Sequence, residues 1–164
     1  RMLLFNRRLF LLSALAATAG CGFTPAFAPG GAATRLQNAV SLDDPSDWED
    51  YLLVRRFEER LGPATPARYG LSYSVNLVET GIAISTDNIV TRYNVLGSVT
   101  YALRDMDTEK VLTSGKVENF TSYSAEGTTV SEQAAKKDAE ERLMLIMTDQ
   151  MITRLTAEAV DLPA

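Results

Sequence analysis

The sequence predicts an α+β fold: a two-layer sandwich in which a four-stranded, mostly antiparallel sheet carries two helices on one face. Three observations lead to this prediction. Apolar residues recur at helical spacing in two segments, residues 46–62 and 129–160. Between them, three successive segments within residues 69–124 alternate apolar and polar residues, as strands with one wet face do. Short turns separate these segments, so hairpins join the strands and the sheet is mostly antiparallel.

The composition is that of one globular domain and weighs against catalysis. The chain has 164 residues, of which 46% are hydrophobic and 23% charged, and a core of this size needs no disulfide or metal. It contains one cysteine and no histidine, so the usual general base and the commonest metal ligand are missing. We therefore expect neither an enzyme nor a bound cofactor or metal. The net charge of -5 provides no basic field, so nucleic acid is not an expected partner.

Residues 1–20 have the pattern of a secretion signal. Basic residues precede an apolar run from Leu9 to Ala19, which is shorter than the roughly 20 residues that a membrane-crossing helix needs. Two cleavage sites compete. The first site lies after Ala28, because Ala26 and Ala28 have the spacing of small residues that an ordinary signal peptidase reads. Pro29 would follow that cut and restrict the backbone around it. The other site lies before Cys21.

Residues 18–21, Thr-Ala-Gly-Cys, resemble the lipobox at which bacterial lipoproteins are lipidated on the cysteine thiol and cut before it. Thr18 stands where that motif usually has leucine. The alternative is that Cys21 is a small buried core residue. Lipidation would anchor the chain to a membrane through acyl chains. Because Gly22 rather than Asp follows the cysteine, we expect sorting to the outer membrane.

Cleavage before the cysteine divides the chain into three parts. They are a signal peptide over 1–20, a lipidated tether over 21–34 and an α+β domain over 35–164. Removal of the signal takes away three arginines and no acid, so the net charge falls from -5 to -8. The mature chain as a whole therefore repels anions, and an anionic ligand must bind to a local group of basic side chains.

The domain opens with a short strand within Leu36–Leu42 and a helix. Ser46–Glu49 matches a capping box, which predicts the helix start there. Gly62 and the proline after it end the helix. Trp48 and Tyr51 fall off its apolar stripe, so they are either edge packing or exposed contacts. The stripe consists of Leu53, Val54, Phe57 and Leu61.

Three strands follow. Tyr69–Leu77 alternates strictly, and Ile89–Leu103 repeats the pattern. The third strand, Val111–Ser124, loses its alternation near Ser114 and at Phe120, which predicts a β-bulge. The inward residues of the middle strand are expected to be Ile89, Tyr93, Val95, Val99, Tyr101 and Leu103.

The last helix is the longest. A second capping box, Thr129–Glu132, predicts its start, and it runs to about Val160. A stripe of Met144, Met147, Met151 and Leu155 is expected to be core. Leu145 and Ile152 form a second apolar face of this helix, which is available for contact with a partner.

The sheet face opposite the helices is expected to be polar, rich in hydroxyls and thinly charged. Such a face is either simply solvated or placed against a wet, polar partner surface. Its predicted residues are Ser72, Ser74, Asn76, Arg92, Asn94, Ser98, Thr100, Lys116 and Ser122.

Four segments cover nearly the whole mature chain in order: Cys21–Pro25, Thr91–Val95 leading to Gly97 and Tyr101, Thr121–Ala125, and Lys137–Leu143. Together they resemble the LptE family of lipopolysaccharide-assembly lipoproteins. The resemblance implies two helices packed on a four-stranded sheet. It also implies an outer-membrane lipoprotein that sits in the lumen of a large β-barrel partner, assists the assembly of that barrel, and helps deliver lipopolysaccharide to the cell surface.

The resemblance also suggests where lipopolysaccharide is contacted, since family members are thought to bind its phosphates through basic residues of the sheet and its loops. Arg92 lies within a matching segment, whereas Lys110 and Lys116 are inferred from their neighbourhood; each is otherwise a solvated surface charge. A net charge of -8 does not favour tight, independent binding of lipopolysaccharide, which is anionic. The role of barrel plug and assembly factor is therefore favoured. The alternative is a periplasmic ligand-binding lipoprotein that serves an inner-membrane lipid transporter.

Overall fold

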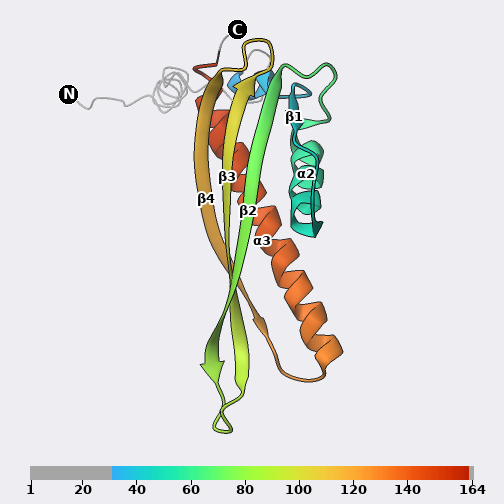
Figure 1. Ribbon diagram of the computed structural model, residues 1–164, viewed down its shortest axis with the longest axis vertical. Helices are drawn as coiled ribbons and strands as arrows, with labels where there is room; N and C mark the ends of the chain where they lie inside the picture. The colour runs from blue at the N-terminus through green and yellow to red at the C-terminus, as the bar shows by residue number, and fades with distance from the viewer. Residues whose placement is uncertain (1–30, 163–164) are drawn as a thin grey trace, which may run out of the picture.

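A computed structural model describes residues 31–162 and has the predicted α+β fold (Figure 1). The four strands form one sheet in the order β1-β2-β3-β4, so the four-stranded prediction is confirmed. β2, β3 and β4 pair antiparallel, whereas β1 pairs with β2 in parallel over three residues. The elements are η1 (Ala32–Arg35), β1 (Val40–Leu42), α2 (Trp48–Leu61), β2 (Tyr69–Ile84), β3 (Val90–Asp105), β4 (Val111–Ser124) and α3 (Thr129–Glu158).

The predicted signal peptide, both cleavage sites and Cys21 lie outside the described residues. The last part of the predicted tether, residues 32–34, belongs to η1, and Ala33 is fully buried. Arg35 then donates from Nη1 to the carbonyl oxygen of Leu162 at 2.7 Å, just beyond the end of α3. The first described residues therefore pack on the domain.

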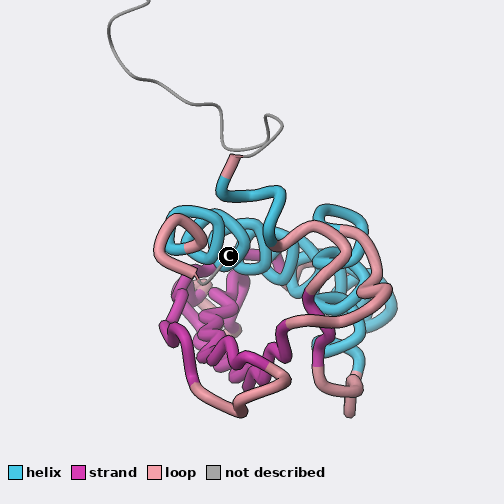
Figure 2. The backbone as a smooth tube through the Cα atoms, turned by 90° about the horizontal axis from the view of Figure 1, so that it is seen from above, coloured by secondary structure: helices cyan, strands magenta, loops and turns pink. Residues whose placement is uncertain are grey.

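Both helices lie on one face of the sheet (Figure 1, Figure 2). α3 packs against β3 and β4, and α2 packs against α3. The methionine stripe is core, as predicted, because its four side chains are at most 1% exposed. Sheet residues that are buried in the same cluster are Tyr69, Leu71, Val95, Val99, Tyr101, Leu103 and Val117.

Gly97 allows α3 to approach the sheet closely. A Cβ atom at this position would lie 2.6 Å from Cε and 2.8 Å from Sδ of Met147, and 2.9 Å from Cδ2 of Leu77. These separations are well inside van der Waals contact, and Met147 is fully buried. A close-packed core has no spare room for a methyl group here, so the glycine sets the spacing between helix and sheet.

The two ends of the molecule differ (Figure 1). η1, the β3–β4 turn and the C-terminal end of α3 lie at one end, which we call the η1 end. The β2–β3 hairpin lies at the other, the hairpin end, and extends beyond the N-terminal end of α3. Ile82, Ile84 and Ile89 of this hairpin are between 49% and 64% exposed.

The start of α2 differs from the prediction by one residue. The N-cap is Asp47, whose side chain accepts a hydrogen bond from the Asp50 backbone N–H at 2.9 Å. The Asp50 carboxylate accepts in turn from the backbone N–H and the hydroxyl of Ser46. The predicted box between Ser46 and Glu49 is therefore wrong. Gly62 ends the helix with a φ of 80°, and its N–H donates to the carbonyl oxygen of Glu58.

The start of α3 shows the same one-residue shift. Thr128 is the N-cap and accepts from the Ser131 backbone N–H at 3.3 Å, so the predicted box over Thr129–Glu132 is wrong. The helix ends at Glu158, close to the predicted end. Ile152, which was predicted to lie on a second face open to a partner, is 1% exposed and belongs to the core.

The strands also differ in detail. The first strand begins only at Val40, because residues 36–39 form a turn that follows the 3-10 helix η1. Ile89 was predicted to point inward, but it lies in the hairpin loop and is 62% exposed. β4 pairs regularly at Phe120, so the bulge predicted there is wrong. The register shift of this strand pair leaves Leu112 of β4 as the extra residue, two positions before Ser114, near which the other irregularity was predicted.

Candidate functional site

The face of the sheet that points away from the helices is the candidate site. Among residues 31–162 no helix covers it, and the register of β2, β3 and β4 arranges its side chains in rows that cross all three strands. All nine predicted polar residues of this face are exposed or half-buried. From the η1 end toward the hairpin end, successive rows are Ser74–Thr100–Lys116, Asn76–Ser98–Glu118, Val78–Leu96–Phe120 and Thr80–Asn94–Ser122.

The polar rows are hydrogen-bonded and carry little net charge. Ser122 donates its hydroxyl to Oδ1 of Asn94 at 2.8 Å. Lys116 forms an ion pair with Glu118, with 2.6 Å between Nζ and Oε1. The four rows from Ser74 to Ser122 thus present amides, hydroxyls and one internally paired cation, whereas Arg92, nearer the hairpin end, is an exposed cation without an ion pair among residues 31–162.

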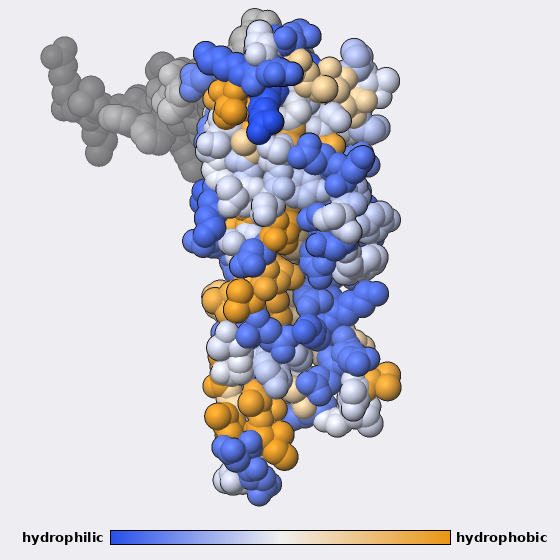
Figure 3. Space-filling view, in the orientation of Figure 1, coloured by the Kyte–Doolittle hydropathy of each residue, from blue (hydrophilic) through white to orange (hydrophobic). Residues whose placement is uncertain are grey.

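One row is apolar, and sequence reasoning missed it. Val78, Leu96 and Phe120, here called the apolar row, are 51%, 45% and 59% exposed and stand side by side on the three strands. They line an open groove of about 630 Å³ whose flanks are polar. Figure 3 shows hydrophobic atoms gathered about midway along the strands on the face that it displays.

Thr121 explains why Phe120 points outward. Thr121 takes the inward position at this point of β4, is 8% exposed, and donates its hydroxyl to the carbonyl oxygen of Ala139 in α3 at 2.8 Å. The buried hydroxyl is therefore satisfied, as burial of a polar group requires. The loss of alternation at Phe120, which predicted a bulge, instead marks a regular strand with a polar residue inside and an aromatic residue outside.

The three predicted cations do not come together. Arg92 pairs with Ser124 in the register and Lys116 with Thr100, eight residues further along β3. At roughly 3.3 Å per residue this separates them by about 26 Å. Lys110 lies in the turn between β3 and β4, at the η1 end. Within the described part of the chain, the side chains of Arg92 and Lys110 form no ion pair.

A second cluster lies on the helical side. Trp48 and Tyr51 stack with ring centroids 5.6 Å apart, and both are exposed, at 40% and 45%. Lys137 of α3 lies 4.5 Å from the Trp48 ring centroid, and Arg55 lies 5.9 Å from that of Tyr51. Both aromatic residues are thus partly exposed. The cation–π contact of Lys137 with Trp48 links α3 to α2, whereas Arg55 and Tyr51 both belong to α2.

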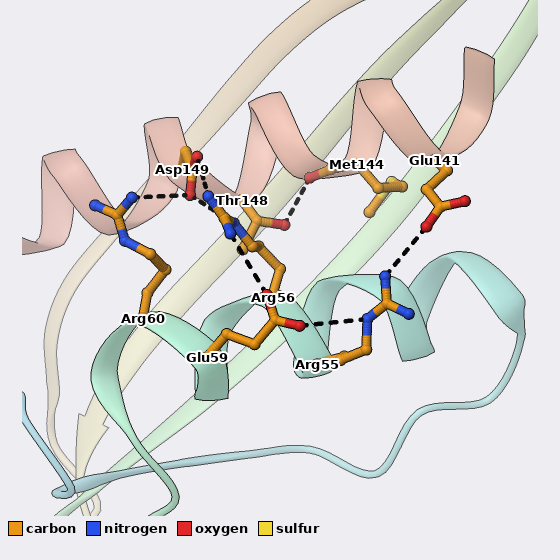
Figure 4. A network of polar contacts seen from close by, with 8 residues as sticks. All are labelled: Arg55, Arg56, Glu59, Arg60, Glu141, Met144, Thr148 and Asp149. Atoms are coloured by element: carbon orange, nitrogen blue, oxygen red, sulfur yellow. Dashed lines mark hydrogen bonds and ion pairs between the residues drawn. The ribbon is translucent and has the colours of Figure 1, made fainter. Parts of the chain in front are cut away.

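Ion pairs continue this contact between α2 and α3 (Figure 4). Arg56 donates to both carboxylate oxygens of Asp149, at 3.0 Å from Nε and 2.8 Å from Nη2. Arg55 reaches Glu141 at 3.2 Å. The hydrogen bonds with Asp149 raise the pKa of Arg56 above its usual value. This network joins the two helices, and its role is structural.

A polar cluster lies between the sheet and α3 toward the hairpin end. Tyr123 is 6% exposed and donates to Glu79 at 3.0 Å, while Nζ of Lys136 lies 2.5 Å from the same carboxylate. Burial and the nearby carboxylate raise the pKa of Tyr123 above its usual range. The hydrogen bond to Glu79 raises the pKa of Lys136. Tyr123 and Lys136 both pair with the Glu79 carboxylate, so the polar groups of this cluster have partners at the edge of the core.

Residues 31–162 contain neither a metal-binding cluster nor a membrane-spanning helix. No three His, Cys, Asp or Glu side chains in this range are grouped so that they could hold a metal ion. No helix in this range is long and apolar enough to cross a membrane.

Three solved structures of bacterial lipoproteins have a similar fold. A lipoprotein from Caulobacter crescentus superposes with a TM-score of 0.66 at 18% identity, covering 78% of this chain and 96% of that one. The rare lipoprotein B from Shewanella oneidensis gives 0.57 at 14% identity, over 75% and 96% of the two chains. A minor lipoprotein from Acinetobacter baumannii gives 0.55 at 13% identity, over 73% and 89%. At these identities the likeness establishes the fold.

The family follows from the sequence match. No curated protein matches the chain. The LptE family, described as lipopolysaccharide-assembly, matches residues 34–155, which include β1 to β4, α2 and nearly all of α3. Together with the fold shared with three lipoproteins, this match identifies the chain as a member of the LptE lipopolysaccharide-assembly family.

Proposed function

We propose that this protein is an outer-membrane lipoprotein, anchored through Cys21, that occupies the lumen of a large β-barrel partner. There it assists the assembly of the barrel and helps deliver lipopolysaccharide to the cell surface. The family match supports the role in lipopolysaccharide assembly. Assistance with the assembly of a barrel needs no catalytic step, so the proposed role is not that of an enzyme.

The observation that carries the proposal is the uncovered sheet face. It extends along three long strands and presents hydroxyls, amides and an internally paired lysine. The lumen of a membrane β-barrel is polar and water-filled, so a protein that fills it needs a hydrated, hydrogen-bonding surface. The face has this chemistry over most of its length.

The arrangement of the ends supports the anchored orientation. The described chain begins at Gly31, at the η1 end, ten residues after Cys21. If Cys21 is lipidated, the η1 end faces the membrane leaflet that holds the acyl chains. The β2–β3 hairpin then points away from that leaflet.

Contact of Arg92, Lys110 and Lys116 with lipopolysaccharide remains part of the proposal. Arg92 is the strongest candidate, because it is exposed and forms no ion pair among residues 31–162, whereas Lys116 is already paired with Glu118. Arg92→Gln should weaken binding of purified lipopolysaccharide to the full chain at least twofold. The matched control is Arg142→Gln on α3, where the arginine pairs with Asp138. Equal binding by both variants would remove Arg92 from the contact surface.

Purification of the anchored protein tests the main proposal. The full chain is recovered from membranes separated by density, and the proteins that accompany it are identified by mass spectrometry. We expect the chain in the outer-membrane fraction together with one large β-barrel protein. Recovery without such a protein contradicts the proposal. Recovery with transporter subunits in the inner-membrane fraction would support the periplasmic ligand-binding role instead.

A further inference from the structure

The apolar row is not what a solvated sheet face requires. Phe120 is 59% exposed while its neighbour Thr121 is buried, so this strand places its aromatic residue in water and its hydroxyl in the core. The reverse order would bury a large apolar side chain, which is worth about 1.5–3 kcal/mol for a residue of this size. A face that met only water would favour that reverse order.

The row is also contiguous. Val78, Leu96 and Phe120 are directly paired in the register, and neighbouring strands lie about 4.8 Å apart. Three partly exposed side chains therefore form one straight apolar line across the sheet. The rows on either side, Asn76–Ser98–Glu118 and Thr80–Asn94–Ser122, are polar.

From this arrangement we propose that the apolar row is the anchor point at which the outer face docks on the wall of another β-sheet, namely the inner wall of the barrel partner. This inference rests on the proposed function and names the contact surface for it. An apolar centre within a polar rim is the usual anatomy of a protein interface.

Charge favours a polypeptide wall over an anionic lipid. The cation that lines the groove, Lys116, is held 2.6 Å from Glu118, so the pair contributes no net charge. Arg92 is four residues from Leu96 along β3, about 13 Å away. A lipid phosphate would meet a neutral surface here, whereas amides and hydroxyls suit a polar protein surface.

Geometry favours a β-sheet partner. Two sheets that pack face to face keep their strands within about 30° of each other, so a row across one sheet meets a row across the other. The cross-strand spacing of about 4.8 Å is common to all sheets, so side chains on a barrel wall match the spacing of the row.

Size argues against a second copy of this chain. Three side chains exposed by about half offer on the order of 250 Å² of apolar area, if a large side chain buries roughly 150–250 Å². A stable interface needs about 800 Å² from each partner. The row therefore requires a partner that also contacts the polar flanks over a wide area, as a surrounding wall does.

Photocrosslinking in the living host tests the inference. The photoreactive residue p-benzoylphenylalanine replaces Phe120 in the full lipidated chain, because its ring preserves the aromatic character of the position. The control places the same residue at Val130, which is 76% exposed in the first turn of α3. We expect an adduct with the large β-barrel protein from position 120 and at least tenfold less from position 130.

The other outcomes each contradict the inference. An adduct of twice the chain mass would assign the row to a second copy, and an adduct with lipopolysaccharide alone would assign it to a lipid. Absence of a barrel adduct at position 120, while purification still recovers the barrel, would overturn the inference and leave the proposed function intact. Failure to recover any barrel with the unmodified chain would overturn the proposed function itself.

A variant pair gives a second readout. Leu96→Thr combined with Phe120→Thr removes two of the three apolar side chains of the row and replaces them with threonine, a β-branched residue that favours strands. We expect at least a tenfold loss of recovered barrel protein with an unchanged melting temperature. Val111→Thr, a residue 48% exposed on β4 outside the row, should retain the barrel. Equal recovery of the barrel by both variants would contradict the inference, and if the double variant melts early, the crosslinking result decides.

Discussion

Replacement of Gly97 by alanine should strain the contact between α3 and the sheet. The new Cβ atom would lie 2.6 Å from Cε of Met147 and 2.9 Å from Cδ2 of Leu77. The Met147 terminus is flexible, but it is fully buried and has no empty space to enter. Overpacking of this kind costs about 1–3 kcal/mol. We therefore expect Gly97→Ala to lower the free energy of unfolding by about 2 kcal/mol.

A double-mutant cycle separates this strain from other effects of the substitution. Met147→Ala alone should cost about 2–5 kcal/mol, because it leaves a cavity in the core. In the double variant the new methyl group at position 97 occupies part of that cavity. The double variant should therefore be more stable than the sum of the single effects predicts, by about 1 kcal/mol or more.

Urea titration of the detergent-solubilised full chain measures these free energies. The matched control is Gly70→Ala on β2, where the nearest atom to the new Cβ would be Cγ of Met106 at 3.7 Å, an ordinary contact. If Gly97→Ala costs no more than Gly70→Ala, or if the effects at positions 97 and 147 simply add, the claim that this glycine sets the helix spacing is wrong.

Three further predictions concern the polar contacts. Arg56→Ala and Asp149→Ala should show a coupling free energy of about 1 kcal/mol in a urea double-mutant cycle, because the pair is bidentate but 25% and 36% exposed. Arg35→Gln should increase hydrogen exchange at the C-terminal end of α3 several-fold, since its guanidinium donates to the carbonyl oxygens of Ala159 and Leu162 just beyond the helix. Burial and nearby carboxylates raise the pKa of Tyr73 from 10.0 to about 12. The folded chain thus holds this proton more tightly, so stability should fall between pH 10 and 12, and less steeply in Tyr73→Phe.

Much of the fold could be predicted because its core obeys simple periodicities. The alternation from Tyr69 onward and the stripe from Met144 to Leu155 each identify a face that points to the core. The structure buries the whole stripe, and of the strand it buries Tyr69 and Leu71, with the later inward residues partly buried against the core. Hydrophobic burial dominates folding and depends on the pattern of apolar residues, so pattern alone recovers the layers.

The helix starts were less predictable, because capping depends on local competition. Ser46 and Asp47 are both good N-caps, and so are Thr128 and Thr129. The capping-box motif selected Ser46 and Thr129. In the structure the backbone N–H of Asp50 donates to Asp47 and that of Ser131 donates to Thr128, so the other residue of each pair is the N-cap. These differences are close to the normal uncertainty of helix ends.

The candidate site could be predicted as a polar face but not as an interface with an apolar centre, for a physical reason. Alternation within one strand identifies its buried side, while the composition of the other side depends on which residues pair across strands. Each of these three strands departs from alternation at this row: Val78 follows Leu77, Leu96 follows Val95, and Phe120 precedes an inward threonine. Taken singly, these look like irregularities. The observed register aligns all three in one row, and a one-residue slip in either pair would flip that strand's side chains to the other face and break the row. Three aligned departures in neighbouring strands are better explained by a partner that contacts them than by three separate defects.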